Sequence, residues 1–235
     1  MSRARALRRL TTTELELMAA CVGAHADLDR EALVRLYQAG AAERWPWMGE
    51  PDGWPGNDTL CALWNDNRPS PEQVVARAIA AAQAADQRYA MGTSGPRWLA
   101  DTFDPEGDGA DCSDLVSWCL GRRKAGGPDW LNSRGQRNWL HTGSIVHDAT
   151  HSQVLFARIA EPVGPCVVSY PDRNGKQGHT AIIITAADGH LRGVDCSYSQ
   201  GRRTGDAVKV RDLSWFTRRA SVVFCRPVWW PEVEL

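Results

Sequence analysis

The sequence predicts an α+β fold in which N-terminal helices pack on an antiparallel sheet, preceded by a small helical extension. Two observations lead to this prediction. Helix-start signals and apolar residues at helical spacing dominate the chain before residue 122. Short β-branched runs, separated by turn-forming residues, dominate it after residue 162. Helices first and strands later are typical of the α+β class.

The chain of 235 residues has room for one catalytic domain of ordinary size and a smaller appendage. Residues 11–44 are predicted to form two helices, the first beginning at the threonines and the second running from Asp29 to Ala41. A loop rich in tryptophan, proline and glycine follows at 45–56. We therefore expect residues 1–69 to form a helical, tryptophan-rich extension or subdomain, and residues 70–235 to form the main domain.

The main domain is expected to begin with a helix at Ser70. Ser70 is a good N-cap, Pro71 suits the first helical position, and Gln73 completes a capping box. This alanine-rich helix is expected to run to about Arg88. The strands expected after it are 166–170, 179–185, 191–196 and 221–228.

Composition excludes some classes of function. The net charge of −1 argues against a nucleic-acid-binding surface. No run approaches the ~20 apolar residues of a membrane span, so no span is expected. The chain starts with basic residues, but Glu14 and Glu16 interrupt the apolar region that a signal peptide needs. We expect no export signal and synthesis in the cytoplasm, with later delivery to the periplasm or cell wall by a phage or a secretion apparatus left open.

The cysteines and histidines do not suggest a metal site. Seven cysteines stand at irregular spacing without a Cys-x-x-Cys pair, which disfavours zinc and redox sites and suits a reducing compartment. His147 and His151 could share a helix face, with His141 nearby, but Asp148 stands where a His-Glu-x-x-His hydrolase has glutamate. We expect neither a metal nor a cofactor.

Cys112 is the strongest candidate for a reactive side chain. It follows Asp111 and precedes the apolar run 115–120, which places its thiol in the first turn of a short helix. Unpaired N–H groups and the positive end of the helix dipole favour a thiolate there, and the thiolate is the attacking species. His179 begins a β-branched run and is the natural base. Each residue alone is explained equally well as core, whereas the two together indicate covalent acyl transfer.

These residues resemble the motifs of the NlpC-type cell-wall cysteine peptidases, a papain-like family. Asp111-Cys112-Ser113-Asp114-Leu115-Val116 matches the family's nucleophile motif, except that Asp114 replaces glycine. Gly178-His179-Thr180-Ala181-Ile182 resembles the strand that carries the family's histidine. Tyr89-Ala90-Met91-Gly92 is similar to an element upstream of the nucleophile. The resemblance covers roughly residues 70–210.

The resemblance implies a papain-like cysteine peptidase domain at 70–235 with Cys112 and His179 as catalytic residues. It places the residue that orients the imidazole on the next strand, where this sequence has Asp195 in place of the family's usual His, Asn or Gln. A carboxylate there would fix the tautomer of the ring. Asp195 could equally cap a turn or pair with Arg192, Arg202 or Arg203.

The resemblance also implies that Tyr89, Asp111 and Ser113 help to bind the substrate. Asp114 is expected either to cap the helix or to favour a cationic substrate group.

The function that the resemblance implies is hydrolysis of amide bonds in peptidoglycan stem peptides, through a Cys112 thioester with His179 as base. Two alternatives stay open. One is a papain-like acyltransferase or isopeptidase that acts on a non-wall substrate, and the other is a catalytically silent wall-binding or phage structural protein. Besides the peptidoglycan peptide, an immunity protein or a phage tail component is a partner that these roles allow.

Overall fold

The structure is a computed structural model that describes residues 7, 10–25, 27–84, 87–91, 103, 109–122, 140–173 and 177–231. The chain divides into two compact units, Met1–Arg68 and Pro69–Leu235. The second unit contains Cys112, His179 and Asp195. Gly92, the last residue of the Tyr-x-x-Gly element, lies outside the described residues.

The first unit contains the helices α2 (Thr12–Val22), α3 (Arg30–Arg44) and α4 (Asn57–Asp66). The first two confirm the prediction, and both begin with side-chain caps: Thr11 accepts from the N–H of Glu14, and Asp29 accepts from the N–H of Ala32. Helix α4 was not predicted, because Gly56 at its N-cap has no side chain to signal the helix start.

A carboxylate joins the helices of the first unit. Asp66 accepts hydrogen bonds from the Tyr37 hydroxyl at 2.7 Å, the Trp45 indole N–H at 2.9 Å and the Arg44 guanidinium at 2.8 Å. Trp45 belongs to the tryptophan-rich loop, so this ring stabilises the first unit from within.

The second unit begins with α5 (Pro71–Gln83). Its predicted capping box is present, since Ser70 and Gln73 each accept from the other's backbone N–H. The expectation that this helix reaches Arg88 is wrong, because Ala84 already has an extended backbone and ends it. The chain then continues through α6 (Cys112–Cys119), α7 (Thr142–His147) and the short π-helix η1 (Asp148–Ser152).

In its described residues the second unit contains one six-stranded antiparallel sheet, with strand order β1-β6-β2-β3-β4-β5. The strands are β1 (Phe156–Ile159), β2 (Cys166–Tyr170), β3 (His179–Thr185), β4 (Leu191–Cys196), β5 (Val208–Asp212) and β6 (Val223–Pro227). β2, β3, β4 and β6 confirm the predicted strands, whereas β1 and β5 were not predicted. Two short helices, α8 (Tyr198–Thr204) and α9 (Ser214–Thr217), flank β5 in the chain.

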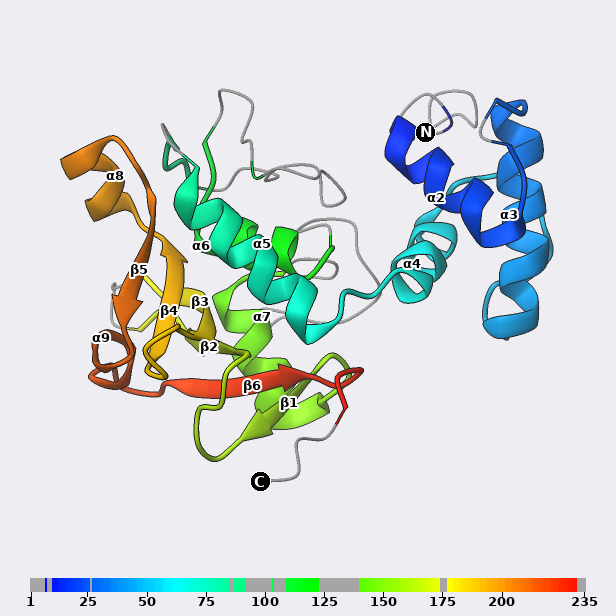
Figure 1. The fold of residues 1–235 in the computed structure, drawn as a ribbon. Coiled ribbons are helices and arrows are strands. Elements are labelled where there is room, and N and C mark those ends of the chain that lie inside the picture. Colours follow the sequence, from blue (N-terminus) through cyan, green and yellow to red (C-terminus); the bar gives the residue numbers. More distant parts are fainter. Residues whose placement is uncertain are drawn as a thin grey trace. The chain divides into compact units, whose positions relative to one another are not determined.

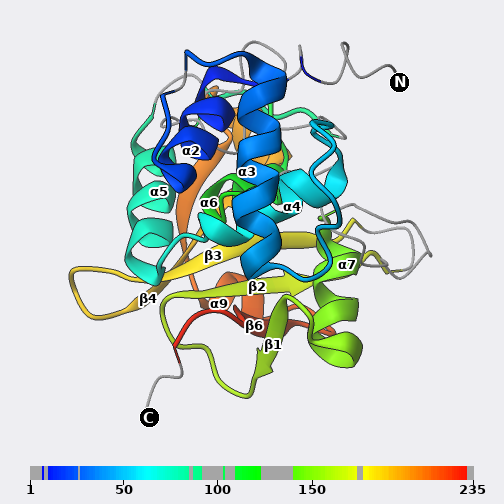
Figure 2. The same cartoon turned by 90° about the vertical axis from the view of Figure 1, so that its right-hand side faces the viewer.

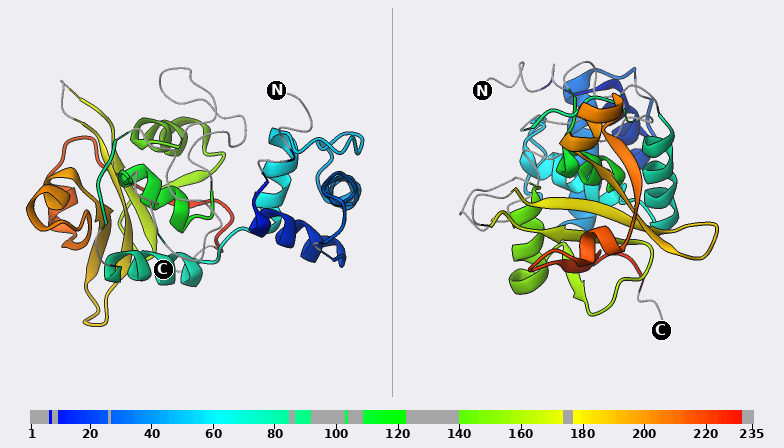
Figure 3. Two further views of the ribbon diagram at one scale, coloured as in Figure 1. Left: turned by 90° about the horizontal axis from the view of Figure 1, so that it is seen from above. Right: turned by 90° about the vertical axis from the view of Figure 1, so that its left-hand side faces the viewer.

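Helices cover both faces of this sheet. Helices α5, α6 and α7 lie on one face (Figure 1), and α9 lies on the other, as the view from above makes clear (Figure 3). The long strands β2 and β3 run side by side through the middle of the sheet (Figure 2). Because side chains alternate between the two faces along β3, Ala181 and Ile183 point toward α9 and pack on buried Phe216. Cys196 points to the opposite face, and its thiol donates to the carbonyl of Ala110 just before α6.

The mixture of helices with an antiparallel sheet confirms the predicted α+β class. Among the helices of the described ranges, none has both the length and the apolar character needed to cross a membrane. All seven cysteines carry free thiols.

Candidate active site

Cys112 is the first residue of α6, and a capping box fixes the start of this helix. Asp111 accepts from the N–H groups of Ser113 at 2.9 Å and Asp114 at 3.1 Å, and Asp114 accepts from the N–H of Asp111 at 2.8 Å. The two carboxylates hold the first turn and so position the thiol of Cys112. Of the two roles expected for Asp114, helix capping is confirmed.

His179 is the first residue of β3, and the glycine before it is required by close packing. A Cβ at Gly178 would lie 2.6 Å from both the Thr142 hydroxyl oxygen and the Tyr170 carbonyl oxygen. Any larger residue would therefore push the start of β3 away from β2 and α7. His179 itself is largely buried, with a side chain 12% exposed.

The structure brings Cys112, His179 and Asp195 together. The side chain of His179 is hydrogen-bonded to the Cys112 side chain and to the Asp195 carboxylate. The bond to Asp195 runs from Nε2 to Oδ2 at 2.7 Å, which leaves Nδ1 as the ring nitrogen available to Cys112. The thiol, the imidazole and the carboxylate are thus joined by hydrogen bonds in that order.

Asp195 is fully buried, and its second partner is Arg211. The Nε of Arg211 donates to Oδ1 at 2.7 Å and to Oδ2 at 2.9 Å. A buried carboxylate needs such a cation, because burial removes the water that would otherwise solvate its charge. The expected arginine partners do not take this place; Arg192, for example, pairs with Asp188 at 3.0 Å.

Aromatic rings from α9 support the imidazole. The Trp215 ring meets His179 edge-on at 5.4 Å, and the Phe216 ring lies nearly parallel to it at 6.3 Å. The Arg211 guanidinium lies over Trp215, 4.5 Å from the ring centroid. The ring of Phe216 fits only because residue 193 is glycine, since a Cβ there would lie 2.1 Å from a ring carbon.

Electrostatics favour a protonated His179. Burial lowers its pKa, but the interaction with an ionised Cys112 and the hydrogen bonds that the ring donates to Asp195 and Cys112 act in the opposite direction and raise the pKa to about 9. These interactions favour the imidazolium form of His179. A protonated imidazole beside a sulfur stabilises a thiolate, which is the arrangement that a cysteine nucleophile requires.

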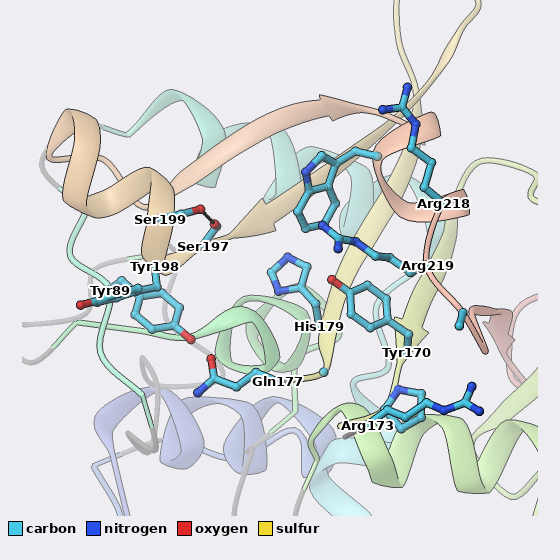
Figure 4. A pocket seen from close by; sticks show the side chains of 14 residues that line it. Tyr89, Tyr170, Arg173, Gln177, His179, Ser197, Tyr198, Ser199, Arg218 and Arg219 are labelled. Atoms are coloured by element: carbon cyan, nitrogen blue, oxygen red, sulfur yellow. Dashed lines mark hydrogen bonds between the residues drawn. The ribbon is translucent and has the colours of Figure 1, made fainter. Parts of the chain in front are cut away.

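A pocket of about 710 Å³ opens beside His179. Figure 4 shows the imidazole near its centre, with Tyr170 and Arg219 on one side and Tyr89 and Tyr198 on the other. The described lining residues are Tyr89, Tyr170, Pro171, Arg173, Gln177, Gly178, His179, Ser197, Tyr198, Ser199, Trp215, Arg218, Arg219 and Ala220. Cys112 is not among these lining residues and is 7% exposed.

Of the three residues expected to bind substrate, Tyr89 lines the pocket, whereas Asp111 and Ser113 are buried in the helix cap. Tyr89 is positioned by a β-bridge to Ala110, two residues before Cys112. Burial raises the pKa of the Tyr89 hydroxyl, and the electrostatic interactions with Cys112 and Asp111 raise it further. The Ser113 hydroxyl donates to Asp111 at 2.7 Å.

Several residues of the site were not predicted, namely Arg211, Trp215, Phe216 and Tyr170. A signal for Arg211 does exist in the sequence. Val208 and Val210 alternate with Lys209 and Arg211, the pattern of a half-buried strand, and a strand after β4 would pair with it. The aromatic residues of α9 give no comparable signal, because a four-residue helix is too short for periodicity.

The three histidines of the rival metal site have local roles. The Nδ1 of His141 accepts from the N–H of Gly143 at 3.0 Å and caps α7. The rings of His147 and His151 stack at 4.6 Å. Within the described ranges, no group of three or more potential ligands is placed to hold a metal ion.

A scan against protein-family models finds no match to this chain, and a search of curated proteins finds none either.

Proposed function

We propose that this protein is a papain-like cysteine hydrolase that cleaves amide bonds in peptidoglycan stem peptides. One observation carries the proposal: Cys112, at the first position of a helix, is hydrogen-bonded to His179, which is bonded in turn to the buried carboxylate of Asp195. A nucleophile, a base and an orienting group in this order are the parts that acyl transfer through a thioester needs.

The chemistry follows from these positions. The Cys112 thiolate attacks the carbonyl carbon of the amide, and the resulting oxyanion accepts from the Cys112 N–H, which has no acceptor within the helix. The Nδ1–H of His179 then protonates the leaving amine, and the C–N bond breaks. Water, deprotonated by the neutral imidazole, attacks the thioester and releases the acid and the thiolate.

The order of the elements supports the papain-like assignment. The nucleophile begins a helix that packs on β3 and β4, and the histidine and carboxylate follow on those same two strands. The substrate class rests on the resemblance of the two catalytic segments to NlpC-type peptidases.

The first experiment is alkylation by iodoacetamide with mass spectrometry of each cysteine, in wild type and in His179→Ala. Burial raises the pKa of Cys119, Cys166, Cys196 and Cys225, so these thiols serve as internal standards of low reactivity. Cys61 is a more accessible standard. We expect Cys112 to react fastest in the wild type and on the order of tenfold more slowly in His179→Ala. A Cys112 that reacts no faster than Cys61 in either protein contradicts the proposal.

The second experiment measures turnover. Wild type, Cys112→Ala and His179→Ala are incubated with a peptidoglycan digest, and the released amines are quantified with and without an added primary amine. Hydrolysis yields free acids in the wild type only. Formation of a new amide with the added amine points to acyl transfer, and full activity in either variant overturns the catalytic assignment.

A further inference from the structure

We infer that the pocket beside His179 binds a carboxylate of the peptide substrate, with Arg219 as the principal partner and Arg218 and Arg173 at its rim. This inference rests on the proposed function and names a chemical feature of its substrate. The inferred substrate group is anionic, whereas Asp114 beside Cys112 would favour a cationic group.

The charge of the pocket is the first argument. Arg173, Arg218 and Arg219 line it together with His179, whereas no Asp or Glu stands among the described residues that line it. None of the three arginines forms a salt bridge to a carboxylate of the described residues. Arginines that line one cavity without a carboxylate partner provide a site for a negatively charged group.

The position of Arg219 is the second argument. Its guanidinium lies over the Trp215 ring, 4.8 Å from the centroid, and Trp215 in turn contacts His179. Figure 4 shows Arg219 reaching toward His179 and Tyr170, while Arg218 and Arg173 lie farther from the imidazole. A stacked guanidinium loses little conformational freedom when it binds an anion, so Arg219 is preorganised.

Tyr170 links this charge to the reacting atoms. Its ring lies 6.1 Å from that of His179. Burial raises the pKa of Tyr170 to about 12, against the opposing charge of Arg219, and Cys112 and Asp195 raise it too. Arg219 and Cys112 therefore both act on the hydroxyl of Tyr170, Arg219 lowering its pKa and Cys112 raising it. A carboxylate bound by Arg219 would lie close to the scissile amide.

The pocket also contains uncharged hydrogen-bonding groups, which suit a carboxylate that is part of a peptide. Tyr89, Tyr198 and Gln177 also line the pocket, and their hydroxyl and amide groups can bind the remaining peptide groups. A cavity of about 710 Å³ is of the size that encloses a small peptide-like ligand.

The test compares two reagents that attack the same thiolate, anionic iodoacetate and neutral iodoacetamide. The ratio of their rates at Cys112 cancels any change in the reactivity of the sulfur itself. We expect a wild-type ratio above that of glutathione. It should fall about threefold in Arg219→Gln, the factor for one unit charge roughly 6 Å away in a solvated site. Arg218→Gln should lower it less.

Arg158→Gln is the matched control, because Arg158 is an exposed arginine on β1, at the opposite edge of the sheet from β5. It makes the same change in net charge and should leave the ratio at the wild-type value. Equal ratios in Arg219→Gln and Arg158→Gln overturn the inference.

A titration separates this inference from the proposed function. N-acetylglutamate, its diamide and inorganic phosphate are each added to the wild type and to Arg219→Gln, and the His179 ring signals are followed by NMR. We expect saturable shifts with N-acetylglutamate that weaken in Arg219→Gln and are absent with the diamide. This readout holds even where Cys112 proves unreactive. Shifts with phosphate alone, or with no anion, overturn the carboxylate assignment.

Discussion

Arg211 donates from one nitrogen, Nε, to both carboxylate oxygens of Asp195, at 2.7 Å and 2.9 Å. Asp195 Oδ2 also accepts from His179, so a single oxygen is shared by the imidazole and the guanidinium. The orientation of the imidazole therefore depends on a residue of β5 that binds the carboxylate holding it. Arg211 acts as a positioning residue, and its removal should disturb both stability and the ring of His179.

The first prediction concerns stability. Arg211→Gln leaves the buried Asp195 carboxylate without its cation, and we expect a loss of about 3–5 kcal/mol in the free energy of unfolding. Arg192→Gln is the control, because Arg192 pairs with the exposed carboxylates of Asp188 and Asp212, and its loss should cost below about 1 kcal/mol. Urea denaturation measures both. Similar losses in the two variants would show that the Arg211–Asp195 pair contributes no more than a surface pair.

The second prediction separates orientation from charge at Asp195. In Asp195→Asn the amide oxygen can occupy the position of Oδ2, where it still accepts from both His179 and Arg211. We expect hydrolysis to fall about tenfold in Asp195→Asn and on the order of a hundredfold or more in Asp195→Ala, which leaves the ring without an acceptor. Values of kcat/KM for the two variants test this. An alanine variant as active as the asparagine variant contradicts the orienting role.

A residue of this site could be predicted from the sequence only where a short local motif marks it. Cys112 and His179 stand in short motifs, and Asp195 follows on the next strand, so all three could be named from the sequence. Arg211 reaches Asp195 because β5 pairs with β4, and Trp215 reaches His179 because α9 folds back over the sheet. Such contacts arise from tertiary packing, which no local pattern records.

The same distinction applies to the fold. β3 was predictable because its β-branched run suits a buried strand on any partner. β1 carries only four residues and pairs with β6, which is far away in the chain, so little in its own sequence indicates a strand. The end of α5 was misjudged because alanine-rich sequence continues past Gln83, while the backbone turns to an extended form at Ala84.

The third prediction concerns the protonation of His179. The charge of Cys112 is the largest of the causes that raise its pKa to about 9, whereas burial lowers the pKa. Cys112→Ala removes that charge and should lower the pKa of His179. The imidazolium persists as pH rises until about 9 in the wild type, and it should be lost at a lower pH in the variant. NMR titration of the ring protons measures this.

Cys119→Ala is the control for that titration, since Cys119 is a fully buried thiol on the same helix and is not among the groups that shift His179. It should leave the pKa of His179 unchanged. In the wild type, kcat/KM for hydrolysis should decline as pH rises through about 9, because deprotonated His179 can no longer protonate the leaving amine. A pKa of His179 that is the same with and without Cys112 rules out the ion pair.

The fourth prediction tests the packing beneath the imidazole. A Cβ at Gly193 would lie 2.1 Å from the ring of Phe216, which is fully buried and surrounded by core residues. Gly193→Ala must displace this ring, at an expected loss of about 1–3 kcal/mol in the free energy of unfolding. Because the Phe216 ring lies parallel to His179, kcat should fall as well.

Gly201→Ala is the control for this prediction. Its new Cβ would lie no closer than 3.4 Å to its nearest atoms, and alanine has a higher helix propensity than glycine, so stability should hold or rise. Thermal denaturation and turnover of the two variants, measured together, decide whether Phe216 supports the catalytic ring: a Gly193→Ala protein as stable and active as Gly201→Ala would mean that it does not.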